Sequence, residues 1–109
     1  MMQDVRNVVV VDDHAAFRKL AKKLLEQIGY RVVGEAATGT GALAEVRRLR
    51  PDLVLLDIQL PDLDGFDVAA RLMSVAPSPT VLLVSTREAK DYGSRLEESG
   101  VTFIAGAAP

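Results

Sequence analysis

The sequence contains no cysteine, no excess of basic charge and no long hydrophobic run. Without cysteine the chain has no disulfide framework, no thiolate metal site and no cysteine nucleophile. Lys and Arg total 13 against 15 Asp and Glu, and the basic residues are scattered, which argues against direct contact with nucleic acid. No apolar stretch approaches the ~20 residues of a membrane helix, and the N-terminus lacks an apolar signal core. We therefore expect no membrane contact and a cytoplasmic location.

The chain has the size of one domain. Its 109 residues, 49% apolar and 26% charged, are enough for a packed core and match the composition of a globular chain. We expect residues 1–109 to form a single domain, with no linker and no separate output domain.

Short apolar runs alternate with helical patterns along the chain. Unbroken runs rich in Val and Leu are typical of strands buried on both faces of a parallel sheet. Three such runs lie at residues 8–11, 53–56 and 81–84, and residues 31–36 and 101–105 supply a second and a fifth strand. Because the connections are short, the order predicts an α/β fold with right-handed crossovers and helices on both faces of the sheet.

The first predicted helix has the strongest pattern. Its apolar positions recur at helical spacing, and Gly29 is typical of the residue that follows a helix. The stripe consists of Phe17, Leu20, Ala21, Leu24, Leu25 and Ile28. We expect Leu20 and Leu24 to be buried. Further helices are predicted at residues 41–50, 65–76 and 89–99.

Side chains with oxygen ligands close three of the predicted strands. Asp12 and Asp13 follow the first run, Asp57 follows the third strand's aliphatic residues, and Ser85 follows the run at 81–84. The carboxyl ends of parallel strands form the ligand-binding edge of such a sheet, so the three acids are expected to converge there. Like charges this close raise a pKa, and Mg2+ neutralises such a group because it prefers carboxylate oxygens.

Beside a bound Mg2+, Asp57 is a candidate nucleophile toward a phosphoryl group, and Ser85 could donate a hydrogen bond to that group. Taken singly, Asp12, Asp13 or Ser85 could be an ordinary helix cap or loop residue. Asp57 is harder to explain this way, because an unpaired charge between aliphatic residues is costly. His14 is interpreted as a helix-start residue and not as a ligand.

Three segments together resemble the receiver domain of two-component response regulators. They are VVVVDDH at 8–14, LVLLDIQLPDLDGFDV at 53–68 and VLLVSTRE at 81–88, and the resemblance covers residues 6–105. It implies a flavodoxin-like α/β fold whose five-stranded parallel sheet, doubly wound by helices, has the strand order 2-1-3-4-5. It also implies phosphorylation of Asp57 by a sensor histidine kinase, and the sequence is similar to receivers usually joined to a helix-turn-helix output domain.

The resemblance assigns Mg2+ as cofactor. Asp13 and Asp57 would bind the ion directly, the backbone carbonyl of Gln59 would join them, and Asp12 would act mainly through water. The domain would relay its signal by protein-protein contacts. It would assist its own phosphorylation and dephosphorylation without being an enzyme for an exogenous substrate.

The resemblance also gives roles to residues around the acids. Ser85 would form a hydrogen bond with the phosphoryl group, and the side chains of Gln59 and Arg87 would tune how long that group survives. Pro61 and Gly65 match the loop that shapes this edge of the sheet.

One departure from the family concerns a lysine. Receivers place a Lys after the fifth strand, where it contacts the phosphoryl oxygen, but the aligned positions here are Gly106 or Ala107, and no Lys follows Lys90. A charge-assisted hydrogen bond that would stabilise the phosphorylated state by roughly 1.5 to 3 kcal/mol is therefore absent. A pseudo-receiver, which binds partners without productive phosphorylation, is the alternative interpretation.

A second departure is the ending AGAAP at 105–109, where the family has a fifth helix. We expect an apolar patch there, open to a partner or to a second copy of the chain. The face made by the fourth helix and the fifth strand is the candidate dimer or partner surface. The aromatic switch position of the family aligns with Ile104, which argues against aromatic switching.

Two enzyme-class alternatives fit less well. GTGALA at 39–44 matches a dinucleotide fingerprint, but it follows the second strand, and the chain has no room for the other half of such a fold. Gly39 and Gly41 are expected simply to shape the loop. A phosphatase with an Asp nucleophile would carry a second Asp two residues later, where this chain has Gln59 after Asp57 or His14 after Asp12.

Overall fold

The computed structural model describes residues 5–85 and 102–105. The elements are β1 (Asn7–Val11), α1 (Ala15–Gln27), β2 (Arg31–Ala36), α2 (Gly39–Leu49), β3 (Leu53–Asp57), α3 (Gly65–Met73), β4 (Thr80–Ser85) and β5 (Thr102–Ala105). The predicted helix at 89–99 and the tail at 106–109 lie outside the described residues. Within those residues, no helix is long and apolar enough to cross a membrane.

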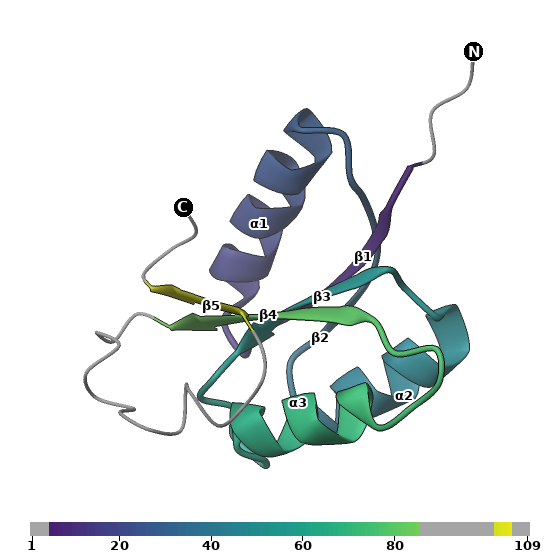
Figure 1. The fold of residues 1–109 in the computed structure, drawn as a ribbon. Coiled ribbons are helices and arrows are strands. Elements are labelled where there is room, and N and C mark those ends of the chain that lie inside the picture. The colour runs from purple at the N-terminus through teal and green to yellow at the C-terminus, as the bar shows by residue number, and fades with distance from the viewer. Residues whose placement is uncertain (1–4, 86–101, 106–109) are drawn as a thin grey trace.

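The five strands form one parallel sheet in the order β2-β1-β3-β4-β5, which confirms the predicted order. Helix α1 lies on one side of this sheet, and α2 and α3 lie on the other (Figure 1). The connection that leaves β1 and the one that leaves β3 therefore turn toward opposite faces. The carboxyl ends of β1 and β3, which are neighbours in the sheet, form the switch point where a ligand site is expected.

Alternation along each strand divides the core into two layers. Val8 and Val10 pack on the α1 side, whereas Val9 and Val11 pack on the side of α2 and α3, and all four are at most 1% exposed. Burial on both faces explains why β1 contains an unbroken run of Val.

The prediction that Leu20 and Leu24 are buried is wrong. Their exposed fractions are 47% and 43%. Phe17, Ala21 and Leu25, four residues apart, form the row of α1 that packs against the sheet. Leu20 and Leu24 each follow a residue of this row by three positions. Three residues advance about 300° around the helix axis, so these two leucines lie in a neighbouring row about 60° from the first. The apolar stripe is thus wider than the surface the sheet covers.

Helix α2 begins at Gly39, two residues before the predicted start, so Gly39 and Gly41 lie in its first turn and not in the loop. Thr38 explains this start, since its hydroxyl accepts a hydrogen bond from the Gly41 N–H at 2.9 Å. The helix ends at Leu49, and Arg50 follows with the left-handed φ of 47°.

Helix α3 ends at Met73, three residues before the predicted end. Ser74 explains the early end, because its N–H and its hydroxyl both donate to the carbonyl of Arg71, at 3.3 and 2.7 Å. A bond to the residue three positions back tightens the last turn and satisfies a carbonyl that the helix would otherwise leave open.

A second, tertiary cap holds the start of α2. The carboxylate of Asp62, in the loop after β3, accepts hydrogen bonds from the N–H groups of Gly39 and Thr40 at 2.7 and 3.0 Å and from the Thr40 hydroxyl at 2.8 Å. These donors favour the ionised form and lower the pKa of Asp62 to about 2. The loop that carries the site is thereby fixed to α2.

We expect Asp62→Asn to lower the melting temperature at neutral pH. The folded-state pKa lies below the ordinary value of 3.8. The stabilisation is therefore present above about pH 4 and is lost as the pH falls toward 2. Thermal melts of wild type and variant from pH 7 to pH 2 measure this difference. Asp67→Asn, at an exposed acid in the first turn of α3 whose side chain caps no other helix among the described residues, is the matched control. An equal effect of both variants would contradict the capping role.

Candidate functional site

The carboxyl edge of the sheet brings together the acids that the sequence placed there. Asp12 and Asp13 follow β1, and Asp57 ends the neighbouring strand β3. One ligand atom from each of these acids, and one from His14, all lie within 4.8 Å of one another. The predicted convergence of the three carboxylates is confirmed.

Asp12 is the most buried of the acids, with 7% of its surface exposed. Its Oδ1 accepts the backbone N–H of His14 at 2.7 Å, and its carbonyl accepts a hydrogen bond from the Arg18 guanidinium at 2.7 Å. Its own N–H donates to the carbonyl of Ala36 on β2 at 3.0 Å. These contacts fix the turn from β1 into α1, so the position of the carboxylate is set by both the strand and the helix.

His14 starts α1 at its N-cap position, as predicted, and it also closes onto the acids. Its Nδ1 lies 2.9 Å from Oδ1 of Asp12 and 3.0 Å from Oδ1 of Asp13. The hydrogen bond with Asp12, followed by the charges of Asp13 and Asp12, raises the pKa of His14 above its ordinary value. Sequence reasoning missed this contact. The available signal was the direct adjacency of the histidine to the acid pair.

Asp57 is half-buried, and its pKa is raised from 3.8 to about 6. Burial is the largest cause, since it penalises the charged form. The N–H of Gln59, which donates to Oδ1 at 3.2 Å, opposes the shift, and the charges of Asp12 and Asp13 add to it. The like charges that the sequence predicts at this edge therefore raise the pKa of Asp57 less than burial does. Near neutral pH most Asp57 carboxyls are still ionised.

The loop after β3 is held close beneath Asp57 by Gly65. The Gly65 N–H donates to the carbonyl of Ile58 at 2.7 Å, and Gln59 forms an isolated bridge with Asp64. A Cβ placed on Gly65 would lie 2.5 Å from the carbonyl oxygen of Asp57 and 2.6 Å from Cα of Ile58. Only glycine allows this close approach of two backbones.

Ser85 ends β4, the other neighbour of β3. Asp57 is paired with Val84, and the N–H of Ile58 donates to the carbonyl of Val84 at 3.1 Å. The backbone of Ser85 therefore lies one position beyond the partner of Asp57, at the same edge. Arg87, Gly106 and Ala107 lie outside the described residues.

The donors at this edge fit a hard divalent cation. Carboxylate oxygens from two adjacent strands suit Mg2+, which binds through one or two carboxylates and retains water. The nitrogen of His14 is more typical of a ligand for zinc or another transition metal. The three acids thus match Mg2+ better than the complete cluster of four residues does.

The parallel sheet and the acidic edge at its switch point are those of an α/β signalling domain, and the family model of the response regulator receiver domain matches residues 8–104. The chain belongs to this family. It is 43% identical over 99 residues to protein-glutamate methylesterase/protein-glutamine glutaminase 6 of Anaeromyxobacter dehalogenans, covering 90% of this chain and 28% of that protein. It is 37% identical over 93 residues to the transcription regulator BvgA of Bordetella pertussis, covering 85% of this chain and 44% of that protein.

Among solved structures, the CheX-CheY-BeF3-Mg+2 complex from Borrelia burgdorferi matches with a TM-score of 0.83 and 25% identity, covering 92% of this chain and 77% of that chain. The chain spans less than half the length of the methylesterase and of BvgA. Their further activities are therefore not carried over to it. The shared part is the receiver, a signalling module.

Proposed function

We propose that this domain accepts a phosphoryl group on Asp57 from a histidine kinase, in a Mg2+-dependent reaction, and relays the signal through protein-protein contacts. The observation that carries the proposal is the convergence of Asp12, Asp13 and a half-buried Asp57 at the switch point of the sheet. Strand ends alone do not require three acids, and their mutual repulsion makes the cluster costly without a cation.

Asp57 acts as the nucleophile. One of its carboxylate oxygens forms a bond to phosphorus while the phosphorus-nitrogen bond of the kinase's phosphohistidine breaks, and the electron pair leaves with the imidazole. A pKa of about 6 keeps most Asp57 side chains ionised and reactive at neutral pH. When bound, Mg2+ neutralises the negative charge on the phosphoryl oxygens.

Asp13 and Asp57 would hold the cation directly, with the Gln59 carbonyl as a third ligand and Asp12 acting through water. The hydrogen bonds of Asp12 support this arrangement, since its Oδ1 already accepts the His14 N–H. Ser85, at the end of β4, would donate to a phosphoryl oxygen. The side chains of Gln59 and Arg87 would control the access of water to the phosphoaspartate.

A partner histidine kinase would supply the phosphoryl group at this edge. The CheX-CheY-BeF3-Mg+2 complex supports the binding of a partner protein, because it contains a related receiver together with a partner protein, BeF3 and Mg2+. The face of the fourth helix and the fifth strand remains the candidate output or dimer surface, and its helix lies outside the described residues.

The test is an intact-mass measurement after incubation with Mg2+ and acetyl phosphate. Wild type should gain one phosphoryl group, and Asp57→Asn should gain none because it lacks the nucleophile. Asp67→Asn, the same substitution at an exposed acid in the first turn of α3, should react like wild type. Omission of Mg2+ should abolish the gain. Modification of Asp57→Asn at the wild-type rate would place the phosphoryl group elsewhere.

A pseudo-receiver is the second candidate function, favoured by the absence of Lys from residues 91–109. Such a domain would keep the fold and bind partners without phosphoryl transfer. The pseudo-receiver function is supported if the wild-type protein gains no mass with any phosphodonor tested while circular dichroism shows that it is folded.

A further inference from the structure

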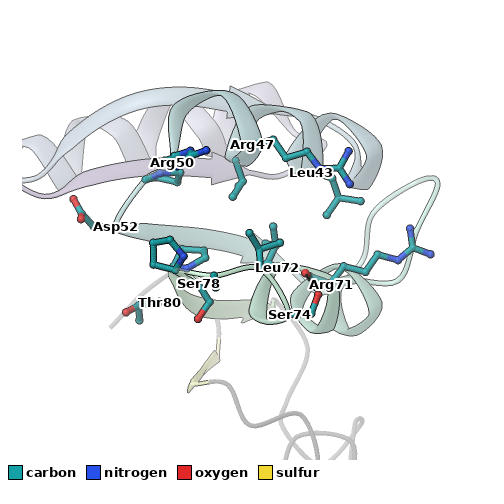
Figure 2. Close-up of a pocket in the computed structure, with 15 residues that line it drawn as sticks. Leu43, Arg47, Arg50, Asp52, Arg71, Leu72, Ser74, Ser78 and Thr80 are labelled. Carbon is teal, nitrogen blue, oxygen red and sulfur yellow. Dashed lines mark hydrogen bonds between the residues drawn. The ribbon is translucent and has the colours of Figure 1, made fainter.

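A groove lies at the end of the sheet opposite to the acids. It is bounded by the last turns of α2 and α3 and by the starts of β3 and β4, and its volume is about 550 Å3 (Figure 2). This volume is within the roughly 300 to 1,000 Å3 of small-molecule sites. Apolar side chains form much of its wall, among them Leu43 and Val46 of α2, Leu72 of α3, and Val75, which follows α3.

Three guanidinium groups border the groove. Figure 2 shows Arg47 and Arg50 on the α2 side and Arg71 on the α3 side, with the side chains of Arg47 and Arg71 extending toward the same end. The guanidinium groups of these three arginines make no hydrogen bond or salt bridge to another described residue. By contrast, Arg48, the next residue along α2, pairs with Glu45 at 2.8 Å.

Arg47 and Arg71 lie in the last turns of α2 and α3, where a positive charge is favourable, but their guanidinium groups do not cap the carbonyls there that have a partner. The carbonyl of Val46 accepts the Arg50 N–H at 2.9 Å, and the carbonyl of Arg71 accepts both donors of Ser74. The backbone therefore satisfies these carbonyls without any guanidinium. The one acid in the lining, Asp52, already accepts the N–H of Asn7 at 2.8 Å.

The lining thus carries three positive side chains and one negative one, on a chain whose net charge is −2. Unpaired guanidinium groups present several N–H donors in a planar fork that matches the oxygens of a phosphate or a carboxylate. Apolar walls beneath them favour a ligand with an apolar body as well as a charge.

We propose that this groove binds a small organic anion. Arg47 and Arg71 hold its phosphate or carboxylate group from the two helices, and the apolar body lies against Leu43 and Leu72. Arg50 adds positive charge near the other end of the groove. The site is separate from the acidic edge, since the groove begins at Asp52 and Thr80, where β3 and β4 start, and Asp57 lies at the opposite end of β3.

A titration of the isotope-labelled protein with 1-naphthyl phosphate, followed by amide chemical shifts, tests the proposal. The buffer contains EDTA, so that Mg2+-dependent chemistry at Asp57 does not contribute. We expect saturable shifts in the last turns of α2 and α3 and at residues 74–80. The double variant Arg47→Gln/Arg71→Gln should weaken binding at least tenfold, and Arg48→Gln, the matched control, should change it less than twofold.

Two further probes separate the parts of the ligand. Naphthalene-1-carboxylate compared with 1-naphthyl phosphate shows which anionic group the arginines prefer, and binding of either supports the site. Neutral 1-naphthol should bind at least tenfold more weakly than the phosphate. The proposal is overturned if naphthol binds equally well, if Arg48→Gln weakens binding as much as the double variant does, or if the shifts cluster away from the groove. The three arginines are exposed, so the variants should melt like wild type, which circular dichroism checks.

Discussion

Replacing Gly65 with alanine is expected to lower the free energy of unfolding by about 2 to 3 kcal/mol and to slow phosphorylation of Asp57 at least tenfold. The new Cβ would lie 2.5 Å from the Asp57 carbonyl and 2.6 Å from the Ile58 Cα. Both contacts are with backbone, which cannot move aside as a flexible side chain can, and overpacking typically costs about 1 to 3 kcal/mol. The strand end must shift, and the carboxylate shifts with it.

Urea unfolding measures the stability loss, and the rate of mass gain with acetyl phosphate measures the effect on the site. Gly29→Ala is the matched control. Gly29 has a φ of +99° and nothing within 4 Å of a built Cβ, so alanine there is strained by the backbone alone. It follows the C-terminal end of α1, whereas Asp12 and Asp13 precede the N-terminal end. The Gly29→Ala variant should lose stability and keep the phosphorylation rate. If Gly65→Ala reacts at the wild-type rate, the loop does not position Asp57.

The second large effect is a pH-dependent stability that belongs to Asp57. In the metal-free protein its folded-state pKa is about 6, above the ordinary 3.8. Between these values the unfolded chain has lost the proton and the folded chain still holds it, so the free energy of unfolding falls as the pH rises from about 4 to 6. Above pH 6 the loss is complete. Two pKa units set an upper bound of about 3 kcal/mol, and solvent screening of a half-exposed group reduces this to about 1 kcal/mol.

Asp57→Asn should therefore be more stable than wild type by about 1 kcal/mol at pH 7 and equally stable at pH 4, in EDTA. The difference between the two proteins isolates Asp57 from the other carboxyl groups that titrate in this range. Addition of Mg2+ at pH 7 should stabilise wild type by mass action, and the variant much less. A difference that does not change between pH 4 and pH 7 would show that burial does not perturb Asp57.

The candidate site could be predicted in part because its residues are adjacent to strong local patterns. Asp12, Asp13 and Asp57 each follow an unbroken apolar run, and parallel strands place such ends at one edge. The contacts that hold the edge were not predictable in this way. Asp62 caps α2 from 22 residues away, and the His14 ring turns back onto the acids, so both depend on distances that no local pattern encodes.

The helices show the same division. Their existence followed from periodicity, but their ends depended on single hydrogen bonds, from Thr38 at the start of α2 and from Ser74 at the end of α3. Likewise the apolar stripe of α1 was visible in the sequence, whereas the row that contacts the sheet was not.

The sequence by itself determined the class of fold, the edge that carries the acids and the family, because each of these rests on spacing along the chain. Only the tertiary structure decided that burial dominates the pKa of Asp57, that Gly65 must lack a side chain, and that three arginines at the ends of two helices border one groove. Those properties arise where segments distant in sequence approach within a few ångströms, and there the environment of each side chain depends on its neighbours in space.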